Sequence, residues 1–185
     1  MTPDTSTSIF GGQTELGPLP SFCIDRADNL KTRPWRHGDL DLLQASESIF
    51  SPETYPRRFL AGDRRLRPLH LRVSGQMSAR GRRWMGQVAV DGDRLVALAE
   101  CGWDPANPQS PALAVMVADA WQQRGLGRRV LRELVRRCLS AGLVVFNLDY
   151  VASNATLGTL VGSLTSNTRH RGGCDLVHRR LVAPD

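Results

Sequence analysis

The feature that most constrains the fold is a short apolar strand that is followed, across a glycine-containing loop, by a long amphipathic helix. Residues 113–117 are an apolar run of strand length, and residues 122–127 contain two glycines in the spacing GxG. The helix after this loop has its apolar residues on one side: Leu126, Val130, Leu131, Leu134, Val135 and Cys138. Such a helix is stable only when that side is buried against another layer, so we expect an α/β protein.

Further strands are predicted on both sides of this unit. Residues 84–90 and 95–101 flank Asp91-Gly92-Asp93, and an Asp-Gly turn between two such runs is typical of a β-hairpin. The Pro and Asn cluster at 105–111 is expected to separate this hairpin from the strand at 113–117, which would be the third of three antiparallel strands. Ala141 and Gly142 end the helix. Shorter segments predict other strands: 32–35, 143–148 and 175–182.

Three further helices are expected. The spacing of apolar residues predicts a helix over 39–50, and Ser51-Pro52-Glu53 is a start signal for a second helix through Phe59. Residues 154–164 are predicted as a short third helix. The expected fold class is therefore α/β (α+β), a single domain over residues 31–185, with a central mixed, mostly antiparallel twisted sheet of about six to seven strands flanked by about four helices. Residues 1–30 are expected to form an N-terminal tail.

Composition excludes several classes of protein. The chain has 185 residues, 41% hydrophobic and 23% charged, which is the balance of a globular domain rather than a disordered or fibrous chain. The longest apolar run, residues 112–118, is far shorter than the ~20 residues of a membrane helix. The first residues lack the layout of a secretory signal, so we expect a cytoplasmic protein. Four widely spaced cysteines are expected to be reduced, and no metal site is predicted.

The net charge of +6 is carried by arginine, since Lys31 is the only lysine. Residues 57–83 contain nine arginines and one acid, Asp63. Nucleic-acid binding is one interpretation of this stretch, but it has few aromatic residues for stacking on bases and matches no common binding motif. A solvated arginine-rich face is the simpler interpretation. Residues 169–171, Arg-His-Arg, are expected to form a basic loop.

The loop between strand and helix has the properties of an anion site. The first turn of a helix has N–H groups without intrahelical acceptors, and they lie at the positive end of the helix dipole. Gly125 and Gly127 would let a pyrophosphate approach the backbone closely. The loop is not a P-loop, because no GK[ST] follows, and it lacks the third glycine of a dinucleotide fingerprint. Taken alone, such a loop is a weak signal, and an ordinary turn between a strand and a helix explains it better.

The wider segment resembles the coenzyme A loop of the GNAT acyltransferase superfamily, whose pattern is Q/R-x-x-G-x-G/A. Gln122, Gly125 and Gly127 fit the fixed positions, and Asn154 lies where the superfamily has an asparagine that touches the cofactor. Residues 33–36, 51–53 and 117–127 look like the acetyltransferase domain of bacterial protein-lysine acetyltransferases. The resemblance implies transfer of an acetyl group from acetyl-CoA to a protein lysine or a small amine. It also implies a set of cofactor-binding residues: Val115, Met116, Val117, Gln122, Gln123, Arg124, Gly125, Leu126, Gly127, Arg128 and Asn154.

The catalytic residues are less clear, because the sequence departs from these relatives. The lysine acetyltransferases that this segment resembles have an acidic residue at the position that is Ala112 here. Glu100 and Asp149 are the alternative candidates for the base, and Tyr150 is the candidate general acid, although packing would also explain that tyrosine. The missing glutamate leaves a second hypothesis open, a catalytically weak GNAT-fold module that binds acyl-CoA. Edge strands near the C-terminus would allow a homodimer.

Overall fold

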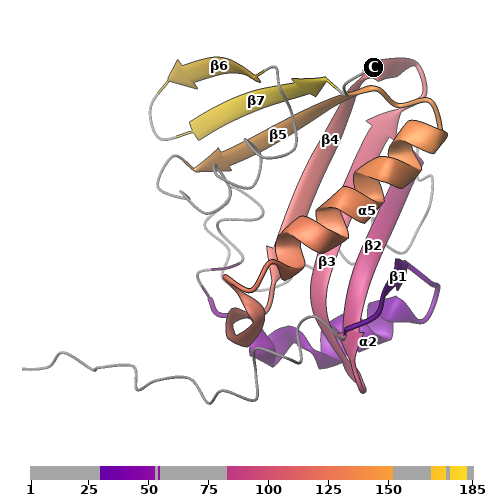
Figure 1. The fold of residues 1–185 in the computed structure, drawn as a ribbon, viewed down its shortest axis with the longest axis vertical. Coiled ribbons are helices and arrows are strands. Elements are labelled where there is room, and N and C mark those ends of the chain that lie inside the picture. The colour runs from indigo at the N-terminus through magenta and orange to yellow at the C-terminus, as the bar shows by residue number, and fades with distance from the viewer. Residues whose placement is uncertain (1–29, 53, 55–82, 152–167, 174–175, 183–185) are drawn as a thin grey trace, which may run out of the picture.

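The computed structural model describes residues 30–52, 54, 83–151, 168–173 and 176–182 (Figure 1). Seven strands form one sheet in the order β1-β2-β3-β4-β5-β7-β6. The strands are β1 Thr32–Pro34, β2 Arg83–Asp91, β3 Arg94–Asp104, β4 Asn107–Val117, β5 Val145–Val151, β6 Thr168–Gly173 and β7 Leu176–Val182. The described α-helices are α2 Asp39–Ala45 and α5 Leu126–Ser140, with short 3₁₀ turns at η1 Glu47–Ile49 and η3 Asp119–Trp121.

The sheet is mixed and mostly antiparallel, as the sequence predicts. β1 to β4 pair antiparallel in chain order, and β5, β7 and β6 form a second antiparallel group. The two groups meet where β4 and β5 pair in parallel, with α5 as the crossover between them. This arrangement confirms a single mixed α/β domain of the predicted class.

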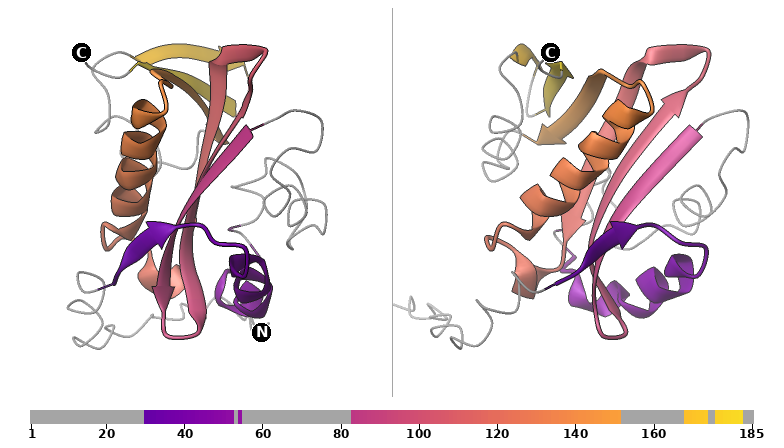
Figure 2. Two further views of the ribbon diagram at one scale, coloured as in Figure 1. Left: turned by 90° about the vertical axis from the view of Figure 1, so that its right-hand side faces the viewer. Right: turned by 45° about the vertical axis from the view of Figure 1, so that its right-hand side comes forward.

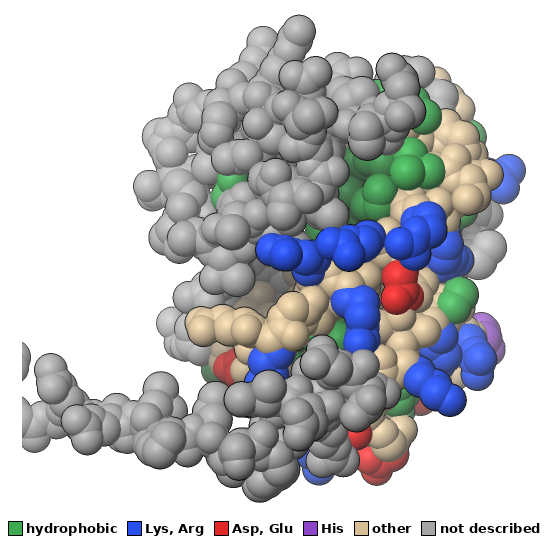
Figure 3. Space-filling view, in the orientation of Figure 1, with side chains coloured by type: hydrophobic (Ala, Val, Ile, Leu, Met, Phe, Trp, Pro, Cys, Tyr) green, Lys and Arg blue, Asp and Glu red, His purple; other side chains and the backbone are tan. Residues whose placement is uncertain are grey.

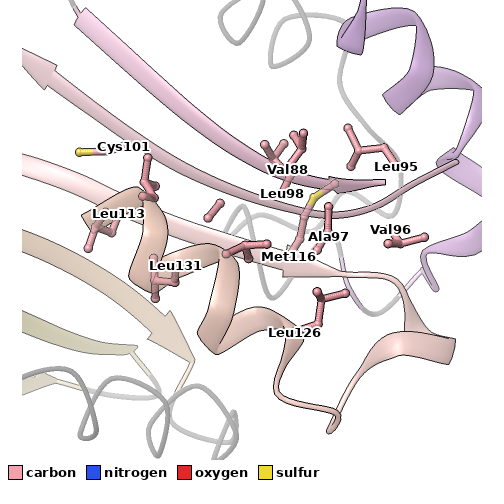
Figure 4. Packing of buried hydrophobic residues seen from close by; sticks show 14 of the residues in the cluster. Val88, Leu95, Val96, Ala97, Leu98, Cys101, Leu113, Met116, Leu126 and Leu131 are labelled. Carbon is pink, nitrogen blue, oxygen red and sulfur yellow. The ribbon is translucent and has the colours of Figure 1, made fainter. Parts of the chain in front are cut away.

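The described helices lie on opposite faces of the sheet. Figure 2 shows α5 along one face and α2 near one end of the other. The apolar side of α5 is buried as its spacing predicts, and Leu131 and Leu134 are fully buried. In Figure 4, Leu126 and Leu131 extend from α5 toward the strands that carry Ala97 and Leu113. This packing holds the loop before α5 at the end of β4.

Polar contacts also attach α5 to the first strands. Glu133 accepts hydrogen bonds from the Thr32 hydroxyl and from Nε2 of Gln87, the latter at 2.8 Å. One turn later, Nη1 of Arg137 donates to the carbonyl oxygen of Gly86 at 2.8 Å and to Oε1 of Gln87 at 3.1 Å. Hydrogen bonds of this kind to charged groups contribute about 1.5–3 kcal/mol each. The orientation of α5 on the sheet is therefore fixed by polar contacts as well as by apolar packing.

Two predictions about the strands need correction. β4 begins at Asn107 rather than near residue 113, so the cluster at 105–111 belongs mostly to the strand. Proline is tolerated there because the β3–β4 register shifts between Gly102 and Asp104, and an irregular pairing does not require every N–H. The basic stretch at 169–171 is not a loop but part of β6, at the edge of the sheet. A homodimer through this edge remains a prediction.

The helix predicted over 39–50 ends at Ala45, because Ser46 interrupts it. The Ser46 hydroxyl donates to the carbonyl oxygen of Leu42 at 2.7 Å and accepts from the Leu95 amide at 2.8 Å. The second contact ties the end of α2 to the start of β3, and the chain continues as η1. The helix predicted at 154–164 lies outside the described residues, as does most of the helix predicted from Ser51.

Two of the four cysteines lie in the described core, free and buried, at Cys101 and Cys138. The hydrogen bond that Cys101 donates to Cys138, together with burial, raises the pKa of the Cys101 thiol. Both are therefore packed thiols, as expected. In the described part of the chain, no helix has the length and apolar character needed to cross a membrane.

Candidate active site

A gap opens in the sheet where β4 and β5 diverge. These strands share one register pair among the described residues, Ala112 with Asn147. β4 then continues to Val117, whereas β5 turns toward β7, so that the carboxyl half of β4 leaves its neighbour (Figure 1). An open gap between parallel strands exposes backbone groups that the sheet does not pair.

The backbone of β4 directs N–H and C=O groups into this gap. The Ala118 amide donates to the carbonyl oxygen of Val96 at 2.9 Å, so the even-numbered residues of β4 pair with β3. By the alternation of an antiparallel ladder, Val115 and Val117 therefore turn their N–H and C=O away from β3 and toward the gap. Met116 turns its backbone toward β3, and its side chain is buried in the core.

The loop after β4 has the geometry of an anion-binding nest. Gln123 has a φ of +58° and Gly125 a φ of +77°, on either side of Arg124. Alternation of left- and right-handed residues turns successive N–H groups toward one point. Gly125 is the N-cap of α5 and makes no side-chain cap, so the first turn of the helix has N–H groups available to a ligand. For Gln123, which is not glycine, this conformation costs of order 1–3 kcal/mol.

The second glycine of the motif has a different role. A Cβ placed on Gly127 would lie 3.2 Å from Cγ2 of Val117. The first turn of α5 therefore lies directly against the last residue of β4, at the side of the gap. Gly125 permits the left-handed N-cap, whereas Gly127 permits the close approach of helix to strand.

Asp119, which the sequence analysis did not single out, organises the loop. Its Oδ1 accepts hydrogen bonds from the Ser51 amide at 3.2 Å, the Thr54 hydroxyl at 3.1 Å and Nε2 of Gln122 at 3.0 Å. The same Nε2 donates to the carbonyl oxygen of Val117 at 3.1 Å. The Gln122 amide thus closes the loop onto the end of β4. The sequence contains one indication of this network. Asp119 lies between the end of an apolar strand and the glycine loop, where its carboxylate could accept hydrogen bonds from a Ser-Pro helix start elsewhere in the chain.

The candidate acids lie on the face of the sheet opposite α5. Cys101 contacts Cys138 of α5, so its neighbour Glu100 points to the other face. Glu100 pairs with Ala114, which puts Ala112 on that face as well, diagonal to Glu100. Since Asn147 pairs with Ala112, Asp149 also lies there, across the gap.

The other predicted residues are distributed around the loop. Tyr150 is buried at 3% exposure and alternates to the face opposite Asp149. Leu126 is buried too, so it can offer only its backbone to a ligand. Arg124 is half-buried, and Arg128 is exposed on α5, along which Figure 3 shows arginines gathered in a band. Asn154 lies outside the described residues.

The fold and the site define a class of protein. The sequence model of the Acetyltransferase (GNAT) family matches residues 42–174. The chain therefore belongs to the GNAT acetyltransferase family, as its coenzyme A loop indicates. No curated protein sequence matches it.

Solved structures share this fold at low sequence identity. The GNAT domain of S. lividans PAT is 18% identical with a TM-score of 0.71, covering 83% of this chain and 90% of that one. For yncA from Salmonella typhimurium, solved with its cofactor acetyl-CoA, the identity is 19% and the TM-score 0.60, over 85% and 95%. Ribosomal-protein-alanine N-acetyltransferase from Brucella melitensis is 21% identical with a TM-score of 0.62, over 83% and 99%. These likenesses are of fold.

Proposed function

We propose that the protein is an N-acetyltransferase that moves an acetyl group from acetyl-CoA to a primary amine, on a protein lysine or a small molecule. The observation that carries the proposal is the position of the nest: the N–H groups of Gln123, Gly125 and the first turn of α5 lie at the end of the β4–β5 gap. A pyrophosphate on the nest would let the rest of the donor extend into that gap. The backbone of Val115 and Val117 would then pair with its amides.

Catalysis in this proposal is direct attack of the amine on the thioester. The ammonium first gives a proton to a carboxylate, and the neutral nitrogen then attacks the carbonyl carbon. The C–N bond forms, the C–S bond breaks, and the second N–H proton passes to solvent water as the amide forms. The sulfur leaves as a thiolate and takes a proton back from the solvent. Positioning of the two reactants beside N–H donors of β4 supplies the remaining acceleration.

Glu100 is the base that we propose. It is 8% exposed and lies one strand away from the gap, beside the small side chains of Ala112 and Ala114. Ala112 is diagonal to Glu100, about 7–8 Å away on the neighbouring strand. In this proposal the Glu100 carboxylate takes the proton at the gap from its own strand, directly or through a water molecule. Asp149 is the second candidate, because it lies on the same face beyond the gap.

One observation favours a second function. Ala112 is exposed and has no titratable group, so a position that is acidic in similar acetyltransferases is not acidic here. A module that binds acyl-CoA and transfers its acyl group slowly or not at all would need the nest and the gap but no base. The alternative therefore shares the cofactor site with the proposed enzyme and differs from it only in turnover.

The first experiment is a calorimetric titration of the full chain with acetyl-CoA and with CoA. Gly125→Glu puts bulk and negative charge into the nest and should abolish binding. Gly142→Glu is the matched control, because Gly142 also has a left-handed φ, of +83°, and a Cβ there, as at Gly125, meets nothing within 4 Å. It lies at the other end of α5, away from the gap.

Three results are distinguishable. Loss of binding in Gly125→Glu alone supports the cofactor site, and CoA release with an amine then supports the enzyme. Binding without release of CoA for any amine supports the acyl-CoA-binding module. Absence of binding by the unaltered chain overturns both.

A further inference from the structure

Trp84 lies across the sheet on the face that carries Glu100. A Cβ placed on Gly86 would be 2.3 Å from Cη2 and 3.0 Å from Cζ2 of the Trp84 ring, and one on Gly102 would be 3.9 Å from Cδ1. The indole therefore extends along β2 from the level of Gly102 to that of Gly86. Any side chain at Gly86 would displace the ring, so this glycine is what lets an indole lie against the strand.

The ring is held in place by a second tryptophan. Trp35 and Trp84 pack edge to face, with ring centroids 5.5 Å apart and an interplanar angle of 86°. The Trp35 amide donates to the carbonyl oxygen of Gly86 at 3.0 Å, which fixes Trp35 beside β2. An edge-to-face arrangement is a preferred geometry for two aromatic rings. Trp84 is half-buried, so part of the ring reaches solvent.

The register places this ring next to the proposed base. Gly86 pairs with Glu100 and Trp84 pairs with Gly102, so the indole, which extends to Gly86, lies on the strand next to Glu100 and on the same face. Ala114 and Ala112 follow on β4, on the same face. From β2 to the gap, this face therefore presents an aromatic ring, a carboxylate and two small side chains.

From this juxtaposition we propose that Trp84 and Glu100 form the acceptor subsite, and that it takes a primary alkylammonium group with an unbranched methylene stem. A carboxylate and an aromatic face both favour a cation, and cation–π contacts contribute about 0.5–2 kcal/mol. The methylenes lie along the indole, while the nitrogen is directed over the alanines to the gap. The subsite rests on the proposed function, since the nitrogen must reach the thioester there.

The test has a binding arm and a kinetic arm. Butyltrimethylammonium, a cation that cannot be acetylated, is titrated into the CoA complex and followed by calorimetry. Trp84→Leu should weaken its binding about tenfold and raise the KM for n-butylamine about as much, with kcat and acetyl-CoA affinity unchanged. Trp84→Phe, which keeps an aromatic face, should restore most of both. Trp103→Leu is the matched control, since Trp103 is a half-buried tryptophan that alternates to the α5 face.

The outcomes separate this inference from the proposed function. If n-butylamine is acetylated and Trp84→Leu leaves its KM unchanged, the subsite is overturned while the enzyme stands. Equal effects of Trp84→Leu and Trp103→Leu overturn it as well, because they show only loss of packing. If no amine is acetylated but the cation binds and loses affinity in Trp84→Leu, the cation contact at Trp84 stands, while its role as an acceptor subsite is overturned together with the enzyme. Failure of the cation and of every amine to bind overturns the subsite.

Discussion

The two faces of the sheet differ in the described elements that cover them. Under α5 the sheet is covered along the helix by apolar side chains, and the polar groups there, Gln87 and Arg137, contact each other. On the opposite face, the described helix α2 lies near one end only (Figure 2). Toward the gap that face carries Glu100 and Trp84.

This difference indicates which residues of a strand stabilise the fold by packing and which are placed to contact a ligand. On β3, Cys101 is fully buried against α5, whereas Glu100, its neighbour, retains some exposure on the other face. A fully packed face tolerates little change, because any lost volume leaves a cavity. The opposite face also holds buried side chains, among them Val88 and Leu98, but toward the gap it carries Glu100 and two alanines, where we expect a ligand. Substitutions on the two faces should therefore separate stability from turnover.

The largest effect is expected for Glu100→Gln. Removal of a general base costs on the order of 10²–10³ in kcat, while the near-isosteric amide keeps the fold and the binding of acetyl-CoA. The measurement is kcat with a saturating amine, together with the thermal midpoint. Asp149→Asn is the matched control and should lower kcat far less. A larger loss in Asp149→Asn would assign the base to β5.

For Leu134→Ala, on the α5 face, we expect a loss of stability with little change in kcat. Leu134 is fully buried, and truncation of a buried leucine should lower the free energy of unfolding by about 3 kcal/mol. Denaturant unfolding measures this loss, and kcat below the unfolding transition should be nearly unchanged. Val144→Ala, at a side chain that is 52% exposed, is the control with little effect. A large loss of kcat in folded Leu134→Ala would break the division between the faces.

Much of the fold follows from local patterns in the sequence. The sequence predicted three features that depend only on neighbouring residues: the Asp-Gly hairpin, the apolar side of α5 and the GxG loop. Gly92 and Gly125 have the positive φ that such turns require. β6 could not be predicted from the sequence, because the residues of its Arg-His-Arg segment do not favour a strand. The segment is a strand because it pairs with β7. The end of α2 at Ser46 likewise depends on a contact with Leu95, which is distant in sequence.

The site was predictable to a smaller extent. The loop motif marks Gly125 because the left-handed N-cap depends on local backbone conformation. The role of Asp119 could not be read, since its partners Ser51 and Thr54 come from another part of the chain. Nor could the sequence place Trp84 beside Glu100, because that contact depends on the β2–β3 register and on Gly86.

A smaller effect, sensitive to pH, is expected at the start of α2, which lies near one end of the face opposite α5. Asp39 accepts two hydrogen bonds from Arg33, both at 2.6 Å, and one from the Arg36 amide at 2.7 Å. Burial opposes ionisation of Asp39, but the contacts with Arg33 and the Arg36 amide outweigh it and lower the pKa of its carboxyl. Asp39→Asn should lower the free energy of unfolding by about 2 kcal/mol at neutral pH.

The sign of the pH dependence follows from that lowered pKa. The stabilisation by ionised Asp39 is complete above the ordinary value of 3.8 and is lost as pH falls through the lower, folded value. The difference in unfolding free energy between the unaltered chain and Asp39→Asn should therefore shrink below about pH 4. Denaturant titrations from pH 3 to 7 measure it. A difference that grows toward low pH would contradict the ion pair as its source.

The smallest effect is expected where the packed face meets the gap, at Gly127→Ala. The new methyl group would lie 3.2 Å from Cγ2 of Val117, so the end of β4 must shift by a few tenths of an ångström. The gain in helix propensity, about 1 kcal/mol, offsets the crowding in stability. Acetyl-CoA binding should weaken only about threefold, because the backbone of Val117 moves with its side chain. Val117→Ala in the same chain removes the crowding and should restore affinity; if it does not, the packed face does not set the geometry of the gap.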